Sequence, residues 1–175
     1  MYLCVMMNAH FHQKLHKIKA FVFDVDGVFT NNHLISTESG DLQRIFNAKD
    51  GFAIKTALDN GFEVCIITGG TSLNVYKRFE QLGVKHNHYK VKDKLVVLKD
   101  FLEKEALSVD EVVYMGDDIP DYEAMNYCGL KCCPNDAVPE IKQIAQYICP
   151  QNGGDACVRE VIEMVLKVQD KWFKF

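Results

Sequence analysis

The sequence lacks three features that would indicate a membrane, nucleic-acid-binding or zinc protein. No apolar run reaches the roughly 18 residues that a membrane-spanning helix needs. Lysine and arginine total 20 against 24 aspartate and glutamate residues, so the net charge is -4 and no basic stripe offers a surface for nucleic acid. The seven cysteines include no Cys-x-x-Cys pair. We therefore expect a cytoplasmic protein with free buried thiols, without a membrane or nucleic-acid partner.

Internal repeats, low-complexity segments and interdomain linkers are also missing from the 175 residues, a length that suits one domain. We predict a tail over residues 1–17, followed by a single domain over residues 18–175. Three histidines of the tail, at positions 10, 12 and 16, could hold a metal ion. A frayed, solvated tail is the expectation we favour.

One apolar run ends at a pair of carboxylates. The run reads Ile18, then 20–23 as Ala-Phe-Val-Phe, and it is followed by Asp24, Asp26 and Gly27. A strand buried on both faces has this composition. Residues two apart in an extended chain point the same way, so the two carboxylates would share one small space. Such a pair needs a cation or a proton between its members, which indicates a Mg²⁺ site, a nucleophile with its acid/base, or both.

Further strands and helices alternate along the chain. We predict strands over 62–67, 112–115, 129–133 and 147–149, and helices over 72–82, after Lys94, from Pro139 and over 158–168. Asp50 is predicted to cap another helix, which ends at Asn60. Two short runs around a polar turn predict a β-hairpin over 33–46. The alternation predicts an α/β fold, a Rossmann-like, doubly wound parallel sheet with helices on both faces.

Polar groups follow three of these strands and would converge at the carboxyl edge of the sheet. Asp24 would attack phosphorus, while Asp26 would protonate the leaving alcohol and later activate water. Asp117 would join Asp24 and the backbone carbonyl of Asp26 on Mg²⁺. Thr68 and the amides after it would bind phosphate oxygens, and Lys94 would hold their charge.

Each motif alone has another interpretation. An Asp-x-Asp pair also occurs in ordinary turns and in the metal–nucleotide sites of glycosyltransferases. A phosphoacceptor receiver domain combines aspartates, a Thr and a Lys, but in a different order along the chain. A catalytically silent copy of the fold, kept as an oligomerisation module, is a third alternative.

Taken together, the motifs resemble those of the haloacid dehalogenase superfamily of phosphatases. The pattern is Asp-x-Asp-Gly from Asp24, Thr68 after an apolar strand, Lys94, and Gly-Asp-Asp-x-x-Asp from Gly116. The resemblance extends from Ile18 to Lys167. It implies a phosphatase that depends on Mg²⁺ and proceeds through an aspartyl-phosphate.

A narrower resemblance is to the 3-deoxy-D-manno-octulosonate 8-phosphate (KDO8P) phosphatases of lipopolysaccharide biosynthesis. It rests on residues 46–51, Phe-Asn-Ala-Lys-Asp-Gly, on Arg78 and Leu82-Gly83, and on the tail from Gly153. The resemblance implies a capless enzyme with a hairpin insertion, acting as a homotetramer on a sugar-acid phosphate. A neighbour's hairpin and C-terminal tail would help to close each site. The substrate contacts that it implies are Asp26, Asn47, Ala48, Lys49, Asp50, Gly51, Lys55, Gly69, Gly70, Arg78 and Lys94.

The sequence departs from this narrower family at three positions. Gly70 stands where the family commonly has Arg, and Asp155 stands where it commonly has a basic residue. Lys49 stands where Arg is usual, which weakens bidentate recognition of a carboxylate. Each change removes or weakens a cation that would face an anionic sugar acid. A phosphatase acting on a nine-carbon keto-deoxy sugar acid is therefore the alternative.

Overall fold

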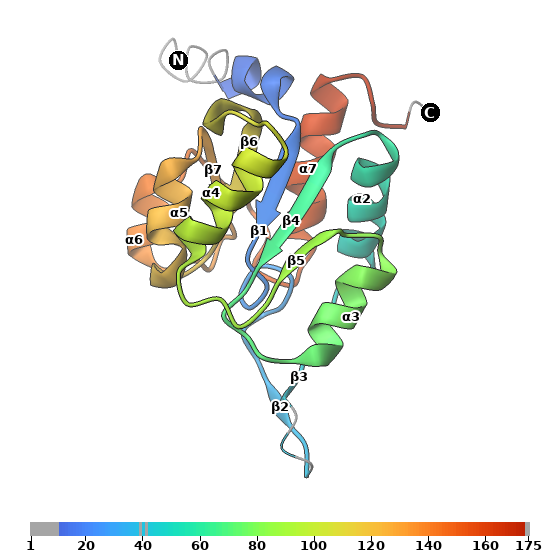
Figure 1. Ribbon diagram of the computed structural model, residues 1–175, viewed down its shortest axis with the longest axis vertical. Coiled ribbons are helices and arrows are strands. Elements are labelled where there is room, and N and C mark those ends of the chain that lie inside the picture. Colours follow the sequence, from blue (N-terminus) through green and yellow to red (C-terminus); the bar gives the residue numbers. More distant parts are fainter. Residues whose placement is uncertain (1–10, 39, 41, 174–175) are drawn as a thin grey trace.

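A parallel sheet of six strands forms the centre of the computed structural model, which describes residues 11–38, 40 and 42–173. The order is β5-β4-β1-β6-β7-β8, with β1 in the interior (Figure 1). The strands are β1 (Ala20–Phe23), β4 (Glu63–Ile67), β5 (His86–His88), β6 (Val112–Met115), β7 (Leu130–Cys133) and β8 (Tyr147–Ile148). The predicted parallel sheet is confirmed.

The register of the central strands decides where the site forms. Phe23, the last residue of β1, pairs with Ile66 of β4 on one side and with Met115 of β6 on the other. The three strands therefore end side by side. The polar residues that follow each of them reach the same edge of the sheet.

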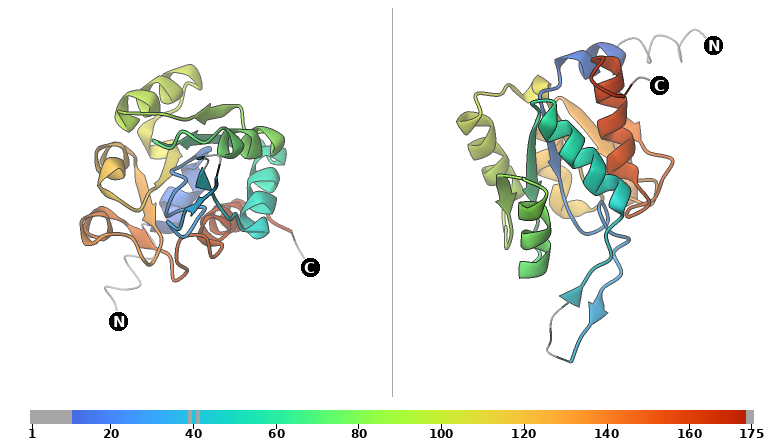
Figure 2. Two further views of the ribbon diagram at one scale, coloured as in Figure 1. Left: turned by 90° about the horizontal axis from the view of Figure 1, so that it is seen from below. Right: turned by 90° about the vertical axis from the view of Figure 1, so that its right-hand side faces the viewer.

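Helices cover both faces of the sheet, as the alternating side chains of β1 require. Phe21 and Phe23 pack in one core with helices α2 (Ala48–Asp59), α3 (Leu73–Gln81) and α7 (Cys157–Val168). Ala20 and Val22 pack in the other core with α4 (Lys94–Lys104), α5 (Tyr122–Tyr127) and α6 (Pro139–Ile144). Figure 2 shows the sheet between α2 and α7 on one side and α4 on the other. Two short 3₁₀ turns, Val109–Glu111 and Ile119–Asp121, precede β6 and α5 respectively.

The predicted hairpin follows the first strand and projects from the carboxyl end of the sheet (Figure 1). Its paired part, β2 (Ile35–Ser36) with β3 (Leu42–Gln43), is shorter than the predicted 33–46. Four apolar side chains of this segment are exposed, and they are Leu34, Ile35, Leu42 and Ile45. The hairpin thus leaves an apolar surface without cover in the single chain.

The prediction of a solvated N-terminal tail is wrong for the part that the structure describes. Residues 11–17 are helical, Leu15 is fully buried in the core, and the ring of Phe11 stacks on Tyr147. Burial of these apolar side chains offsets the entropy of ordering the segment. His12 and His16 are exposed on this helix, and His10 lies outside the described residues.

The predicted cap of helix α2 is also wrong. Asn47 caps it, because its side-chain oxygen accepts a hydrogen bond from the Lys49 N–H. Asp50 lies in the first turn and is buried, where its Oδ1 accepts from the Arg159 N–H at 2.7 Å. Ala156, which precedes α7, has no side chain that could cap that helix. Asp50 supplies the cap from another helix, which local sequence rules do not anticipate.

Two expectations drawn from the composition can be compared with the structure. The six cysteines among the described residues are free and buried, as predicted, and Cys4 lies outside those residues. Within residues 11–38, 40 and 42–173, no helix combines the length and apolarity that crossing a bilayer requires.

Candidate active site

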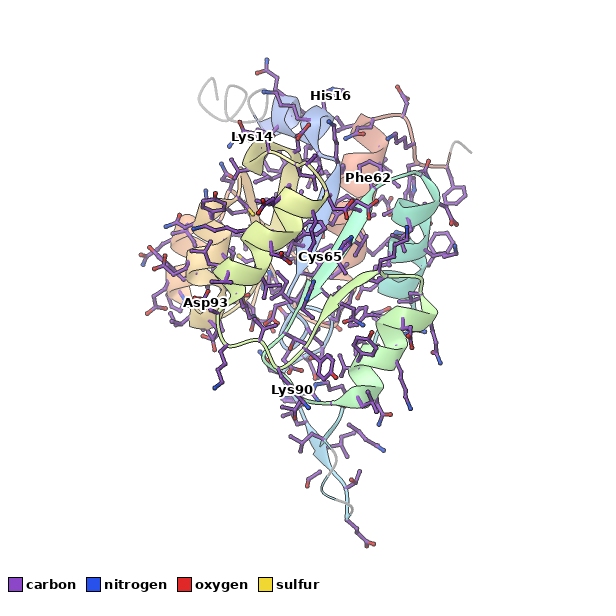
Figure 3. The ribbon with its side chains drawn as sticks, in the orientation of Figure 1. Lys14, His16, Phe62, Cys65, Lys90 and Asp93 are labelled. Carbon is purple, nitrogen blue, oxygen red and sulfur yellow. The ribbon has the colours of Figure 1, made fainter. Side chains whose placement is uncertain are left out.

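A polar cleft of about 400 Å³ lies at the carboxyl ends of β1, β4 and β6. The residues that line it are Asp24, Asp26, Asn32, Thr68, Gly69, Gly70, Val91, Lys92, Lys94, Asp117, Asp118 and Pro120. Figure 3 shows the nearby Lys90 toward the hairpin, and Lys14 and His16 at the opposite end of the molecule. The structure thus brings together the catalytic and metal-binding residues predicted from the sequence.

Asp24 and Asp121 share one buried cation at the floor of this cleft. The Nζ of Lys94 lies 2.9 Å from Asp24 Oδ1 and 2.8 Å from Asp121 Oδ1. Burial raises the pKa of Asp24 well above its ordinary value, and the charge of Asp121 raises it further against the opposing effect of Lys94. Burial lowers the pKa of Lys94, but Asp24 and Asp121 raise it by more, so the ammonium stays charged. Two carboxylates with one lysine leave an excess of negative charge.

Asp117 adds a third carboxylate and is only partly satisfied. Its Oδ2 accepts a hydrogen bond from Asn32 Nδ2 at 3.0 Å, whereas its buried Oδ1 has no hydrogen-bond partner among the described residues. Burial raises the pKa of Asp117 to about 6. Gly27 makes this approach possible, because a Cβ there would lie 1.9 Å from Asp117 Oδ2. A buried acceptor without a donor costs free energy unless a ligand supplies one.

These residues suit a small, hard divalent cation such as Mg²⁺. Carboxylate oxygens of Asp24, Asp117 and Asp121 lie within 4.8 Å of one another. Asp121 is the least available of the three, because its oxygens already accept from Lys94, the Tyr114 hydroxyl and the Asp117 N–H. The partnerless Oδ1 of Asp117 and the carboxylate of Asp24 remain as ligands, which is the oxygen-only set that Mg²⁺ prefers.

The loop after β4 borders the cleft with hydrogen-bonding groups. Thr68 is buried, and its Oγ1 accepts from the Gly70 N–H at 3.0 Å. Its backbone is fixed on both sides, because its N–H donates to His88 and its carbonyl accepts from Val91. The hydroxyl and the neighbouring amides are therefore held at the edge where a phosphate would lie.

Asp26 is held by a residue that the sequence did not predict for the site. Arg44 donates from Nε to Asp26 Oδ1 at 2.6 Å and from Nη2 to Asp26 Oδ2 at 2.9 Å. Arg44 follows β3, so the hairpin delivers this guanidinium to the second carboxylate of the motif. Asn32, with φ of 63°, was missed in the same way. No local motif marks either residue, because only the folded hairpin and turn place them.

One predicted substrate contact, Asn47, instead holds the chain near the cleft. Asn47 donates from Nδ2 to the Gly154 carbonyl, and the Gly154 N–H donates to Val28 in the loop after Asp26. Gly153 packs directly on that loop, because a Cβ there would lie 2.0 Å from the Gly27 carbonyl. The glycine pair thus connects the start of α2 to the catalytic loop.

Six predicted substrate contacts, namely residues 48–51, Lys55 and Arg78, do not line the cleft in the single chain. Ala48 and Lys49 are exposed at the start of α2, and Lys55 pairs with Asp59 on its outer surface. Arg78 lies over Gly51, where a Cβ would meet its Nη2 at 2.7 Å. The same side chain lines a separate hollow of about 300 Å³ beside the hairpin. Asp118, next to the predicted ligand, is exposed and caps the 3₁₀ turn that follows it.

Comparison with known proteins identifies the family of the chain. A family model of haloacid dehalogenase-like hydrolases matches residues 87–162. The chain is also 34% identical over 165 residues to the 3-deoxy-D-manno-octulosonate 8-phosphate phosphatase KdsC of Salmonella typhi, covering 94% of this chain and 88% of that protein. The chain belongs to this family of haloacid dehalogenase-like phosphatases. The resemblance stated from the sequence motifs is confirmed.

Solved structures of family members extend the likeness to the fold. The phosphatase from Yersinia pestis gives a TM-score of 0.89 at 32% identity, covering 91% of this chain and 86% of that one. The Moraxella catarrhalis phosphatase, in complex with magnesium, phosphate and KDO, gives 0.88 at 31% identity and 92% coverage of both chains. The predicted fold, the core of this phosphatase family with a hairpin after the first strand, is therefore confirmed.

Proposed function

We propose that this protein is a Mg²⁺-dependent phosphatase that hydrolyses 3-deoxy-D-manno-octulosonate 8-phosphate to KDO and phosphate. One observation carries the proposal: Asp24 is buried at the end of β1 with Lys94 at 2.9 Å and Asp117 beside it. A nucleophile, a phosphate-binding cation and a metal-binding carboxylate are thus together. Family membership supports the substrate, and with it a cytoplasmic role in lipopolysaccharide biosynthesis.

In the first half-reaction, a carboxylate oxygen of Asp24 attacks phosphorus, and the bond from phosphorus to the C8 oxygen of the sugar breaks. Asp26 donates a proton to that leaving oxygen, so KDO departs as an alcohol. Lys94 and the amides after Thr68 hold the phosphoryl oxygens in the required orientation. The product on the protein is an aspartyl-phosphate at Asp24.

In the second half-reaction, Asp26 takes a proton from a water molecule, which attacks the same phosphorus. The bond from phosphorus to Asp24 breaks, and inorganic phosphate leaves. Asp24, Asp117 and the backbone carbonyl of Asp26 would hold Mg²⁺. When bound, the ion offsets the repulsion between the anionic nucleophile and the anionic phosphate.

A turnover screen tests this function directly. Purified protein with Mg²⁺ is assayed against KDO8P, a nine-carbon keto-deoxy sugar acid 9-phosphate, hexose phosphates and para-nitrophenyl phosphate, with Asp24→Asn as the matched control. We expect the highest kcat/KM for KDO8P and none for the variant. Absence of any hydrolysis by the wild type would instead indicate a catalytically silent oligomerisation module.

The nine-carbon substrate is the second candidate, because three positions have lost or weakened a cation. Gly70 leaves no side chain beside Thr68. The exposed Lys49 stands where the family usually has Arg, and the exposed Asp155 stands where it commonly has a basic residue. A higher kcat/KM for the 9-phosphate in the screen would reassign the substrate and leave the reaction class unchanged.

We also propose a homotetramer whose hairpins meet at its centre. Leu34, Ile35, Leu42 and Ile45 are between 40% and 73% exposed, and such a cluster of apolar side chains marks an interaction surface. Residues 169–173, which follow α7, lie at the end of the sheet opposite the cleft (Figure 1), so a neighbour would help to close each site. Sedimentation equilibrium at assay concentration tests this. A fully active monomer would contradict the shared site.

A further inference from the structure

Arg44 makes a two-point contact with Asp26 from behind the cleft. Its Nε and Nη2 donate to the two carboxylate oxygens at 2.6 and 2.9 Å, and its Nη1 donates to the Leu42 carbonyl at 2.8 Å. Its side chain is only 5% exposed, whereas that of Asp26 is 30% exposed. A planar fork fixes the plane of a carboxylate, which a single contact cannot do. One face of Asp26 is thus held, and the rest is free toward the cleft.

The surroundings show that Arg44 faces Asp26 rather than a substrate. Arg44 is not among the residues that line the catalytic cleft. It instead borders a small gap beside the loop after β4, together with Thr68, Gly70, Ser72 and Val75, and it also lines the hollow of about 300 Å³ beside the hairpin. Its two hydrogen bonds to Asp26 are therefore its contact with the catalytic cleft.

Gly70 belongs to the same arrangement. A Cβ at this position would lie 3.4 Å from Arg44 Nη2, 3.6 Å from Asp26 Oδ2 and 3.2 Å from Thr68 Oγ1. A larger side chain would have to compete with the guanidinium for this space. The cation beside the second motif aspartate thus comes from the hairpin, and residue 70 contributes none.

We propose that Arg44 is the positioning residue for Asp26, holding the acid/base carboxylate at the angle from which it serves the leaving oxygen and the attacking water. The inference rests on the proposed function, because that function gives Asp26 its role. It explains why a buried arginine is carried by an otherwise exposed hairpin. A misplaced acid costs rate without weakening the binding of substrate.

The test compares Arg44→Met, Arg44→Lys, Asp26→Asn and the double variant Arg44→Met/Asp26→Asn, with the exposed neighbour Gln43→Met as the control. For KDO8P we expect Arg44→Met to lower kcat by roughly 10- to 100-fold at unchanged KM. Arg44→Lys keeps the charge but loses the fork, so its recovery should be partial. The first release of para-nitrophenolate should keep the wild-type rate, because that leaving group departs without a proton.

The double variant decides whether Arg44 acts through Asp26. If it does, Arg44→Met causes no further loss in the Asp26→Asn background. Two results would overturn the proposal and make Arg44 a substrate contact. Arg44→Met could lower kcat in the Asp26→Asn background by the same factor as in the wild type, or it could raise KM without changing kcat. Should Arg44→Met fail to fold, the same comparison is made with Arg44→Lys.

A second readout separates this inference from the proposed function. The same variants are unfolded in urea without substrate, and the coupling between positions 26 and 44 is taken from the four midpoints and slopes. If positions 26 and 44 are coupled but the protein hydrolyses no phosphomonoester, the proposed function is wrong and the contact between Arg44 and Asp26 stands. Absence of coupling in an active protein would overturn the role of Arg44 alone.

Discussion

The two ends of the sheet treat their acidic residues in opposite ways. At the amino end, the partly buried Glu111 pairs with Lys19, whose Nζ lies 2.5 Å from its Oε1. Glu105 lies 2.9 Å from the Nε2 of His86, which it shares with Glu63 at 3.9 Å. At the carboxyl end, Asp24 and Asp121 share Lys94, and one buried oxygen of Asp117 has no partner among the described residues.

The pKa values of acids at the two ends of the sheet differ because their surroundings differ. Hydrogen bonds from Lys19 and Ser108 lower the pKa of Glu111 to about 2, whereas burial raises the pKa of Asp117 to about 6. Glu111 is thus stabilised as an anion, whereas Asp24 and Asp117 resist ionisation until a cation arrives. Uncompensated negative charge in a folded protein therefore indicates where a metal ion and phosphate chemistry belong.

The largest expected effect is the loss of the nucleophile. Asp24→Asn should reduce turnover by roughly 10⁴-fold or more, because an amide cannot form the acyl-phosphate. The variant should still fold, because Lys94 keeps Asp121 as its partner when the buried charge of Asp24 is removed. Steady-state assay beside an unfolding curve measures both. Wild-type-like kcat in the variant would exclude Asp24 as the nucleophile.

Removal of the shared cation should cost both stability and activity. Lys94→Met leaves Asp24 and Asp121 buried without a counter-charge, which is expected to lower the free energy of unfolding by about 3–5 kcal/mol at pH 7. The loss should be smaller at pH 5 than at pH 7, because the raised pKa of Asp24 favours its neutral form as the pH falls. Urea unfolding at the two pH values measures this. An equal loss at both would mean that packing, and not charge, is the role of Lys94.

Stability should fall with rising pH when Mg²⁺ is absent. The pKa of Asp117 is about 6 in the fold and near 3.8 in the unfolded chain, so the fold binds the proton more tightly. Stability is therefore lost between about pH 4 and pH 6, by about 3 kcal/mol for a group so shifted. Mg²⁺ should restore it at pH 7.5 but not at pH 5, where protons compete.

Two variants make that measurement specific. Asp117→Asn should reduce the pH dependence and abolish the stabilisation by Mg²⁺. Asp50, whose pKa is also raised by burial to about 6, lies away from the cleft against α7. Asp50→Asn should reduce the pH dependence while keeping the Mg²⁺ effect. The same response in both variants would refute the metal role of Asp117.

The smallest effect is expected at the amino end of the sheet. Glu111→Gln removes a carboxylate whose partner is the exposed Lys19 at the surface, and such pairs contribute little. Turnover and Mg²⁺ dependence should be unchanged within error. A kinetic defect in this variant would show that the two ends are coupled, against the contrast drawn above.

Much of the site could be predicted because a parallel sheet places the ends of its strands together. Asp24, Thr68 and Asp117 each follow an apolar run, so the alternation of strands and helices was enough to bring them to one edge. Lys94 begins a helix that packs on the same sheet. For these residues, a local pattern and one topological rule decide the position.

The remaining contacts depend on packing between distant segments. Asp50 is of a residue type that often caps its own helix, but its side chain accepts a hydrogen bond from the N–H of Arg159, 109 residues away in the sequence. Arg44 looks like an ordinary exposed hairpin residue until the hairpin folds back on Asp26. The burial of Leu15 likewise depends on a core formed by later strands. Rules based on neighbouring residues do not describe contacts between segments far apart in the sequence. These contacts could therefore not be predicted from the sequence alone.

The most direct test is to trap the covalent intermediate. The protein is mixed with KDO8P or para-nitrophenyl phosphate and Mg²⁺, quenched in acid during turnover, reduced with borohydride and mapped by peptide mass spectrometry. We predict that residue 24 alone is reduced to homoserine, and only when Mg²⁺ and substrate are both present. Turnover with no change at Asp24, or with the label on another residue, would contradict the account.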